Sequence, residues 1–246
     1  MDTIISSFTP ILEYGILFLL IVALLVIKKV IKKFGGGMLS QLFSYFSVGT
    51  IFLILMRLFI HFVELNILSV ASGALHFWWH VMFYLAMLSF FFGLKGMVDL
   101  ADGKEDKIAK MISKWQFTSV VAVLVIMFFS ITTGNSWASF YEGALFENVG
   151  LHHFVAFAIS ALVVYYLVQS KKKIGTIGTG IAMPFTIGLS FWGLQHFWEL
   201  LTESWKIILL DDEIIEHVEQ YFVIIAVFAL IYSFVQLKKS IVVKTS

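Results

Sequence analysis

The chain has 246 residues, of which 60% are hydrophobic, 17% are aromatic and only 13% are charged. Soluble domains carry about 25% charged residues, so this composition excludes an ordinary soluble protein. The net charge of +1 says little by itself, because it hides an uneven distribution of basic residues, and no nucleic-acid partner is expected. The lack of cysteine excludes disulfides and thiolate metal ligands.

Seven stretches of the chain are long and apolar enough to cross a bilayer as helices, since a span needs about 20 such residues. We predict these spans at 10–30, 43–65, 74–98, 115–134, 150–169, 176–201 and 215–236. All connections are short, so residues 1–246 are expected to form a single all-α transmembrane domain with the lipid bilayer as its main partner. The first stretch is not expected to be a signal peptide, because it carries Glu13 and ends in lysines.

Related pentapeptides lie at or near the ends of alternate spans. HFVEL occupies 61–65, SFYEG occupies 139–143 and HFWEL occupies 196–200. Each is followed by a histidine near the start of the next span. The pattern suggests one helix followed by three helical hairpins.

Basic residues predict the orientation of the chain. Fifteen of the 17 lie at or just beyond the ends of the first, third, fifth and seventh spans, and the exceptions are Arg57 and Lys206. Because cytoplasmic loops carry the excess of lysine and arginine, this side is expected to be cytoplasmic. The N-terminus would then lie outside and the C-terminus inside, in a multipass protein of the cell (inner) membrane.

All histidines fall near the predicted outer face: His61, His76, His80, His152, His153, His196 and His217. Ionisable side chains within a membrane are costly and mark functional sites by default. His76 and His80 lie one helical turn apart, a spacing that suits a shared ligand face. Neighbouring residues point about 100° apart on a helix, so only one of the pair at 152–153, taken as His153, is expected to face the bundle.

Imidazole and carboxylate without thiolate suit iron, copper or zinc, so we predict a metal centre. Glu64 and Glu199 are also candidate general bases, and Glu213, one turn before His217, is expected to orient that imidazole. The alternative is an interfacial aromatic belt with hydrogen-bonded histidines. The predicted ligands are His61, His76, His80, His153, His196, His217, Glu64 and Glu199.

Arg57 lies one turn inward of His61, where an unpaired guanidinium would be costly. A salt bridge to Glu13, Glu64 or Glu216 is the first expectation. Arg57 could instead bind a cofactor through an anionic group such as a haem propionate.

The favoured function is redox or metal-assisted chemistry on a small or lipophilic substrate, by a membrane oxidoreductase or hydrolase. A b-type haem subunit for electron transfer is an alternative, with two histidines as iron ligands. A second alternative is a transporter of metal ions or protons. A third alternative is a non-catalytic subunit that works with other membrane subunits or with a periplasmic or extracellular partner. Whether the chain is an enzyme stays open at this stage.

Overall fold

The computed structural model describes residues 8–65, 67, 72–104, 150–170 and 175–243. Within these ranges the chain is helical, without strands. The predicted span at 115–134 lies outside the described residues. The elements are α2 (Phe8–Lys33), α3 (Met38–Glu64), α4 (Ser72–Ala101), α7 (Leu151–Ser170), α8 (Gly175–Glu199), the short π-helix η1 (Leu200–Ser204) and α9 (Asp212–Val243).

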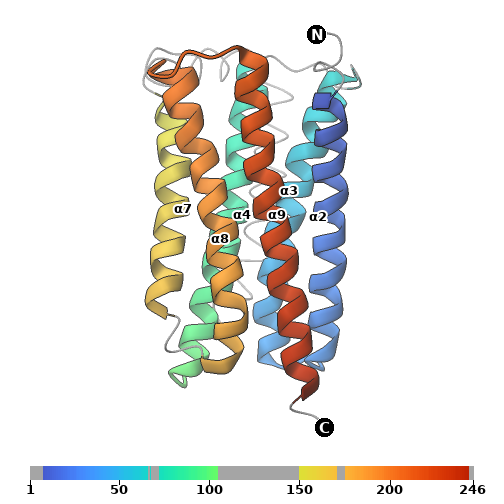
Figure 1. Cartoon of the computed structure of the whole chain (residues 1–246). Helices are drawn as coiled ribbons and strands as arrows, with labels where there is room; N and C mark the ends of the chain where they lie inside the picture. The colour runs from blue at the N-terminus through green and yellow to red at the C-terminus, as the bar shows by residue number, and fades with distance from the viewer. Residues whose placement is uncertain (1–7, 66, 68–71, 105–149, 171–174, 244–246) are drawn as a thin grey trace.

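The six long helices stand side by side in a closed ring (Figure 1). Going round the ring, the order is α2, α3, α4, α7, α8 and α9, and α9 packs back against α2. The helices α2, α4, α7 and α9 begin at the end of the bundle where α3 and α8 finish. Residues near these termini therefore meet at one end of the ring, although they are far apart in sequence.

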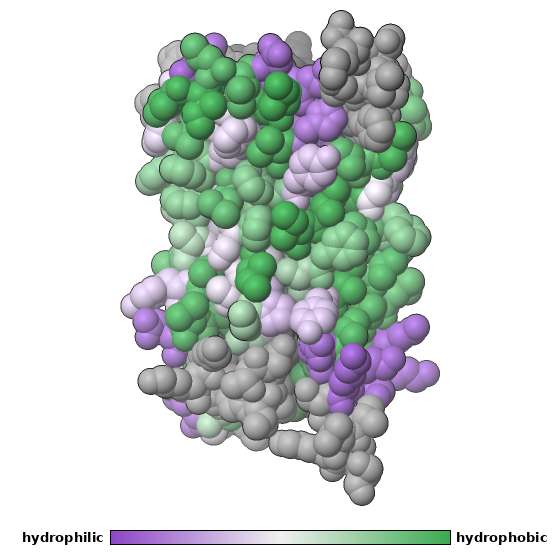
Figure 2. All heavy atoms as spheres, viewed as in Figure 1, coloured by the Kyte–Doolittle hydropathy of each residue, from purple (hydrophilic) through white to green (hydrophobic). Residues whose placement is uncertain are grey.

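Five of the described helices are long and apolar enough to cross a membrane: Ile11–Lys33, Met38–Val63, Trp78–Ala101, Leu151–Gln169 and Asp212–Lys239. Apolar side chains cover the middle of the visible face, and hydrophilic residues gather toward its two ends (Figure 2). This arrangement supports the predicted membrane protein.

The surface of helix α2 is typical of a membrane-spanning helix. One apolar stripe of this helix is buried in the bundle, and a second apolar stripe is exposed on the outside. A helix of a soluble protein would have a polar outer face. The buried stripe is Ile16, Leu20, Ala23, Ile27 and Val30, and the exposed stripe is Ile11, Tyr14, Phe18, Ile21 and Leu25.

Aromatic packing fills the interior of the bundle in the half where α3 and α8 begin. The ring of Phe46 on α3 makes edge contacts with Phe185 on α8 and Phe234 on α9, with centroids 5.3 and 5.4 Å apart. Phe90 on α4 stacks against Phe46 at 6.0 Å. All four side chains are buried. The polar site described below therefore lies in the other half of the bundle.

Candidate metal centre

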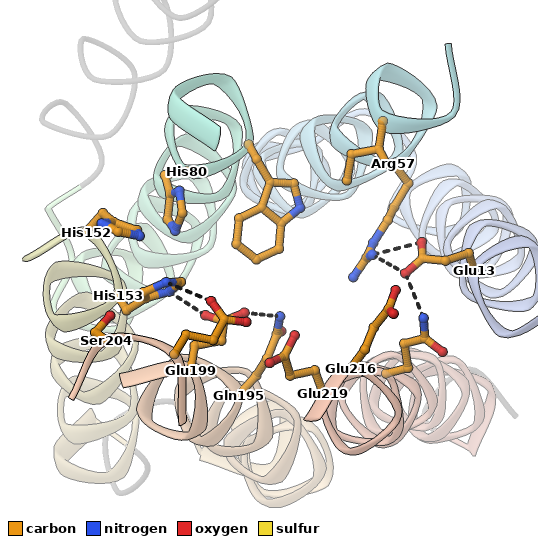
Figure 3. A pocket seen from close by; sticks show the side chains of 14 residues that line it. Glu13, Arg57, His80, His152, His153, Gln195, Glu199, Ser204, Glu216 and Glu219 are labelled. Carbon is orange, nitrogen blue, oxygen red and sulfur yellow. Dashed lines mark hydrogen bonds and ion pairs between the residues drawn. The ribbon is translucent and has the colours of Figure 1, made fainter. Parts of the chain in front are cut away.

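A cavity of about 400 Å³ lies among the helix ends opposite the phenylalanine-rich half. Every helix of the ring contributes to its wall (Figure 3). His80, His152, His153 and Glu199 stand on one side, and Arg57 and Glu13 stand on the other. The remaining lining residues are Ile60, Trp79, Gln195, Glu203, Ser204, Glu216, Glu219 and Gln220.

Three imidazoles meet at the junction of α4 and α7. One ligand nitrogen from each of His80, His152 and His153 lies within 4.8 Å of the others. The ring centroids are 4.5 Å apart for His80 and His152, 5.2 Å for His80 and His153, and 4.0 Å for His152 and His153. His80 and His153 are buried, and His152 is half-buried. This group is compact enough to hold one metal ion.

The start of α7 brings both of its histidines to the cavity. We expected only one of them to face the bundle, and that expectation is wrong. Helix α7 packs against both α4 and α8. Two consecutive side chains that point about 100° apart can therefore both face the bundle, and His152 and His153 both line the cavity. The hydroxyl of Tyr84 on α4 also donates a hydrogen bond of 2.9 Å to the backbone carbonyl of His152, which ties the two helices together at this level.

Glu199 lies behind the imidazole group and is 3% exposed. Its Oε2 atom is 2.6 Å from Nδ1 of His153 and 2.6 Å from Nδ1 of His196. The amide of Gln195 donates a 3.0 Å hydrogen bond to the other carboxylate oxygen. His153, His196 and Glu199 also form a second group of atoms close enough to share an ion. The HFWEL sequence produces this arrangement because residues three and four apart share one helix face.

The end of α8 widens into the π-helix η1, where the backbone N–H of Trp205 bonds the carbonyl of Leu200 at 2.8 Å. Such turns are rare and are often found at functional sites. The turn brings Glu203 and Ser204 to the cavity wall, and the Oε2 atom of Glu203 is 3.7 Å from Nε2 of His153. Partial burial raises the pKa of Glu203, and the negative charge of Glu199 raises it further.

The opposite wall of the cavity holds the buried ion pair that the sequence suggested. Nη1 of Arg57 donates to both carboxylate oxygens of Glu13, at 2.7 and 2.9 Å. The side-chain amide of Gln220 donates to the same carboxylate at 3.4 Å. Glu13 was one of three expected partners, so the guanidinium is matched by a charge within the protein.

The structure brings together four of the predicted metal ligands: His80, His153, His196 and Glu199. The predicted ligands His61 and His217 are not in either group of potential ligands among the described residues. The ring of His61 stacks on Tyr14, with centroids 4.6 Å apart.

His217 Nδ1 lies 2.5 Å from the backbone carbonyl of Glu213. Glu213 thus contacts this imidazole through its main chain rather than through the expected carboxylate. The side chains of the predicted ligands His76 and Glu64 lie outside the described part of the structure.

Several lining residues were not anticipated from the sequence. A helical-face argument could have found Gln195, which lies four residues before Glu199, and also Glu219 and Gln220 of α9, which lie three and four residues after the expected Arg57 partner Glu216. Nothing in the local sequence signals the π-helix that brings Glu203 to the wall.

Comparison of the chain with protein-family models, curated proteins and solved structures found no match. The functional argument therefore depends on the geometry of the site.

Proposed function

We propose that this chain is a multipass membrane metalloprotein in which His80, His152 and His153 hold one transition-metal ion for chemistry on a small or lipophilic substrate. The observation that carries the proposal is the buried convergence of three imidazoles, with one nitrogen each within 4.8 Å, on the wall of a cavity of about 400 Å³. Three imidazole ligands are typical of catalytic zinc sites that keep a coordination position open. Iron and copper also accept imidazole ligands.

Glu199 supports this proposal by fixing the protonation of its neighbours. The carboxylate of Glu199 is hydrogen-bonded to Nδ1 of His196 at 2.6 Å, and the same oxygen makes an ion-pair contact of 2.6 Å with Nδ1 of His153, which has no hydrogen-bond partner among the described residues. The negative charge favours a proton on Nδ1 of His153, and Nε2 would then be the nitrogen that binds the metal. Ligating histidines commonly donate their other N–H to a carboxylate in this way. We therefore assign Glu199 to orienting His153 rather than to direct metal binding.

The cavity beside the imidazole group could hold the substrate. A metal bound there would act as a Lewis acid toward water or substrate. Glu203 lies 3.7 Å from Nε2 of His153, where its carboxyl group can exchange a proton with a molecule bound at the metal. Trp79 and Ile60 supply apolar wall for a lipophilic substrate.

A small ion fits the described residues better than haem b does. The rings of His80 and His196 pack against Trp79, with centroids 4.8 and 5.6 Å away, and Glu199 bridges His153 and His196. Bis-histidine ligation would instead need a slot for the flat macrocycle between two imidazoles. The imidazoles here are in contact with one another.

The membrane topology is part of the same proposal. We propose seven spans with the N-terminus outside, because the basic residues that the structure describes, apart from Arg57 and Lys206, lie toward the helix ends away from the cavity. The metal centre would then open near the outer face of the cell membrane. Association with other membrane subunits or an extracytoplasmic partner is compatible with this topology.

The test is elemental analysis and visible spectroscopy of the chain purified in detergent. We expect at least one equivalent of iron, copper or zinc per chain and no Soret band. His80→Ala and His152→Ala should each lose that ion, whereas the control His217→Ala should keep it. Metal-free wild-type protein that also binds no added Zn²⁺ would contradict the proposal, as would a Soret band.

A further inference from the structure

The connection between η1 and α9 exposes large apolar side chains, although it is a loop at one end of the bundle. It runs over residues 205–211, with the sequence WKIILLD, at the end that holds the cavity (Figure 1). Trp205, Ile207, Leu209 and Leu210 are all exposed, and Leu209 is 81% exposed. Loops that face water are normally polar. Exposed apolar surface of this kind marks contact with a membrane or with another protein.

The start of this loop is held firmly against η1. Lys206 adopts the left-handed conformation, with φ of 49°, that is common just beyond a helix end. The backbone N–H groups of Ile207 and Ile208 then both donate to the carbonyl of Leu201, at 2.8 and 3.2 Å. The exposure of the apolar side chains that follow is therefore a property of the fold.

The apolar surface of the loop is continuous with the outer faces of the two helices that it joins, α8 and α9, which pack side by side. The exposed apolar residues of each helix are spaced three, four or seven positions apart, so they form one stripe per helix. The stripe on α8 is Met183, Ile187, Leu194 and Phe197, and the stripe on α9 is Ile214, Tyr221, Ile225, Phe228 and Tyr232. In a membrane both stripes face the acyl chains, and the loop extends the same surface.

The chemistry of the loop fits the headgroup level of a bilayer. Irregular backbone is not found exposed to the hydrocarbon core, because its polar groups would lack partners there. Tryptophan is enriched where headgroups meet acyl chains, and the long side chain of lysine lets its ammonium reach the headgroups. Trp205 and Lys206 stand next to each other at the start of the loop. Asp211 and Asp212 come at its other end, where carboxylates also favour the N-terminus of α9.

We infer that residues 205–210 form an interfacial segment that binds phospholipid in the leaflet at the cavity end, with Ile207, Leu209 and Leu210 among the acyl chains. This inference goes beyond the proposed function and does not depend on a bound metal. It has a consequence for the cavity, because η1 carries both this segment and the lining residue Ser204. The cavity wall would then lie beside lipid, where a lipophilic substrate collects.

The test measures the depth of the segment with a spin label. The chain has no cysteine, so a single introduced cysteine carries a single nitroxide. Leu209→Cys is labelled and reconstituted in phosphatidylcholine vesicles, and power-saturation electron paramagnetic resonance compares collisions with oxygen, which concentrates in lipid, and with a water-soluble nickel chelate. We expect oxygen collisions to dominate. Ile207→Cys should give the same result and provides a second variant should Leu209→Cys fold poorly.

Two labelled positions calibrate the measurement. Asp211→Cys lies in the same loop at an exposed acidic position, and its label should collide several-fold more with the chelate than the label at 209 does. Phe18→Cys lies on the exposed apolar stripe of α2 and should report lipid. The melting temperature of each labelled chain checks that it is folded.

Two other results would each overturn the inference. Chelate collisions at 207 and 209 as frequent as those at 211 would place the segment in water. Few collisions with either reagent would show that protein covers it, either a second copy or another part of this chain.

Discussion

Glu199 on α8 lies 2.6 Å from Nδ1 of His153 on α7, through the same oxygen that contacts His196 in its own helix. The contact crosses between two helices in a nearly water-free position, since both side chains are buried. One carboxylate therefore sets the ring orientation of an imidazole that also belongs to the group formed with His80 and His152.

Glu199→Gln should weaken metal binding at the imidazole group about 10–100-fold without unfolding the protein. The neutral amide would remove the negative charge that lies 2.6 Å from Nδ1 of His153, and its N–H₂ group could face that nitrogen instead. The preference for a proton on Nδ1 of His153 would then be lost. Competition of the protein with a Zn²⁺ chelator measures the affinity. Glu213→Gln is the control, and unchanged affinity in Glu199→Gln would show that the carboxylate does not orient the ligand.

Replacing either partner of the Arg57–Glu13 pair should destabilise the bundle strongly. Their side chains are 6% and 13% exposed, and a single buried charge left without its partner costs about 3–5 kcal/mol. We expect Arg57→Leu and Glu13→Leu each to lower the melting temperature in detergent, and the double variant to be more stable than either. A double variant that only adds the two losses would argue against a direct pairing.

Gly150→Ala should both destabilise the protein and disturb the imidazole group. Gly150 has φ of +62°, and a Cβ atom there would collide with the side chain of Ser204. The left-handed conformation costs a non-glycine residue about 1–2 kcal/mol, and the collision would push the start of α7 away from η1. Loss of melting temperature and of bound Zn²⁺ are the measurements.

Gly35→Ala is a matched control for Gly150→Ala, because Gly35 has φ of +63° and a methyl group added there would meet no other atom within 4 Å. It carries the same backbone penalty without the collision and should keep its metal. Adding Ser204→Gly to Gly150→Ala should restore part of the lost metal binding. Equal effects at the two glycines would mean that the contact with Ser204 is unimportant.

Glu203 should make the metal-free protein less stable as the pH rises. Partial burial and the charge of Glu199 raise its pKa in the folded state above the ordinary value near 4.5. The folded chain then holds a proton that the unfolded chain releases, so the free energy of unfolding falls from about pH 4.5 up through the raised pKa. Glu203→Gln cannot lose that proton, and its melting temperature should fall less over this range, measured in chelator.

The same pH series on Asp211→Asn should follow wild type, because this acid is exposed and does not line the cavity. If Glu203→Gln kept the full wild-type pH dependence, the carboxyl group at 203 would not be the one that titrates.

The sequence alone was enough to predict a helical membrane protein with its histidines near one face. Both conclusions depend on local properties. Span length and hydropathy can be read directly from the sequence. Because successive spans cross the membrane in opposite directions, the end of one span and the start of the next lie on the same side. The described histidines and lysines follow this pattern, apart from Lys206. The need of Arg57 for a carboxylate partner was also predictable, because an unpaired guanidinium in a membrane is costly, but the choice of Glu13 among the three candidates came from the structure.

Only the tertiary structure decided which imidazoles meet. The ring order places α4 beside α7 and α7 beside α8, so His80 meets His152 and His153, whereas His61 faces Tyr14 on α2. Sequence spacing gives the relative angle of side chains on one helix, but not the rotation of each helix about its own axis or the identity of its neighbours. Packing sets those two quantities. The π-helix that carries Glu203 to the cavity was likewise visible only in the structure.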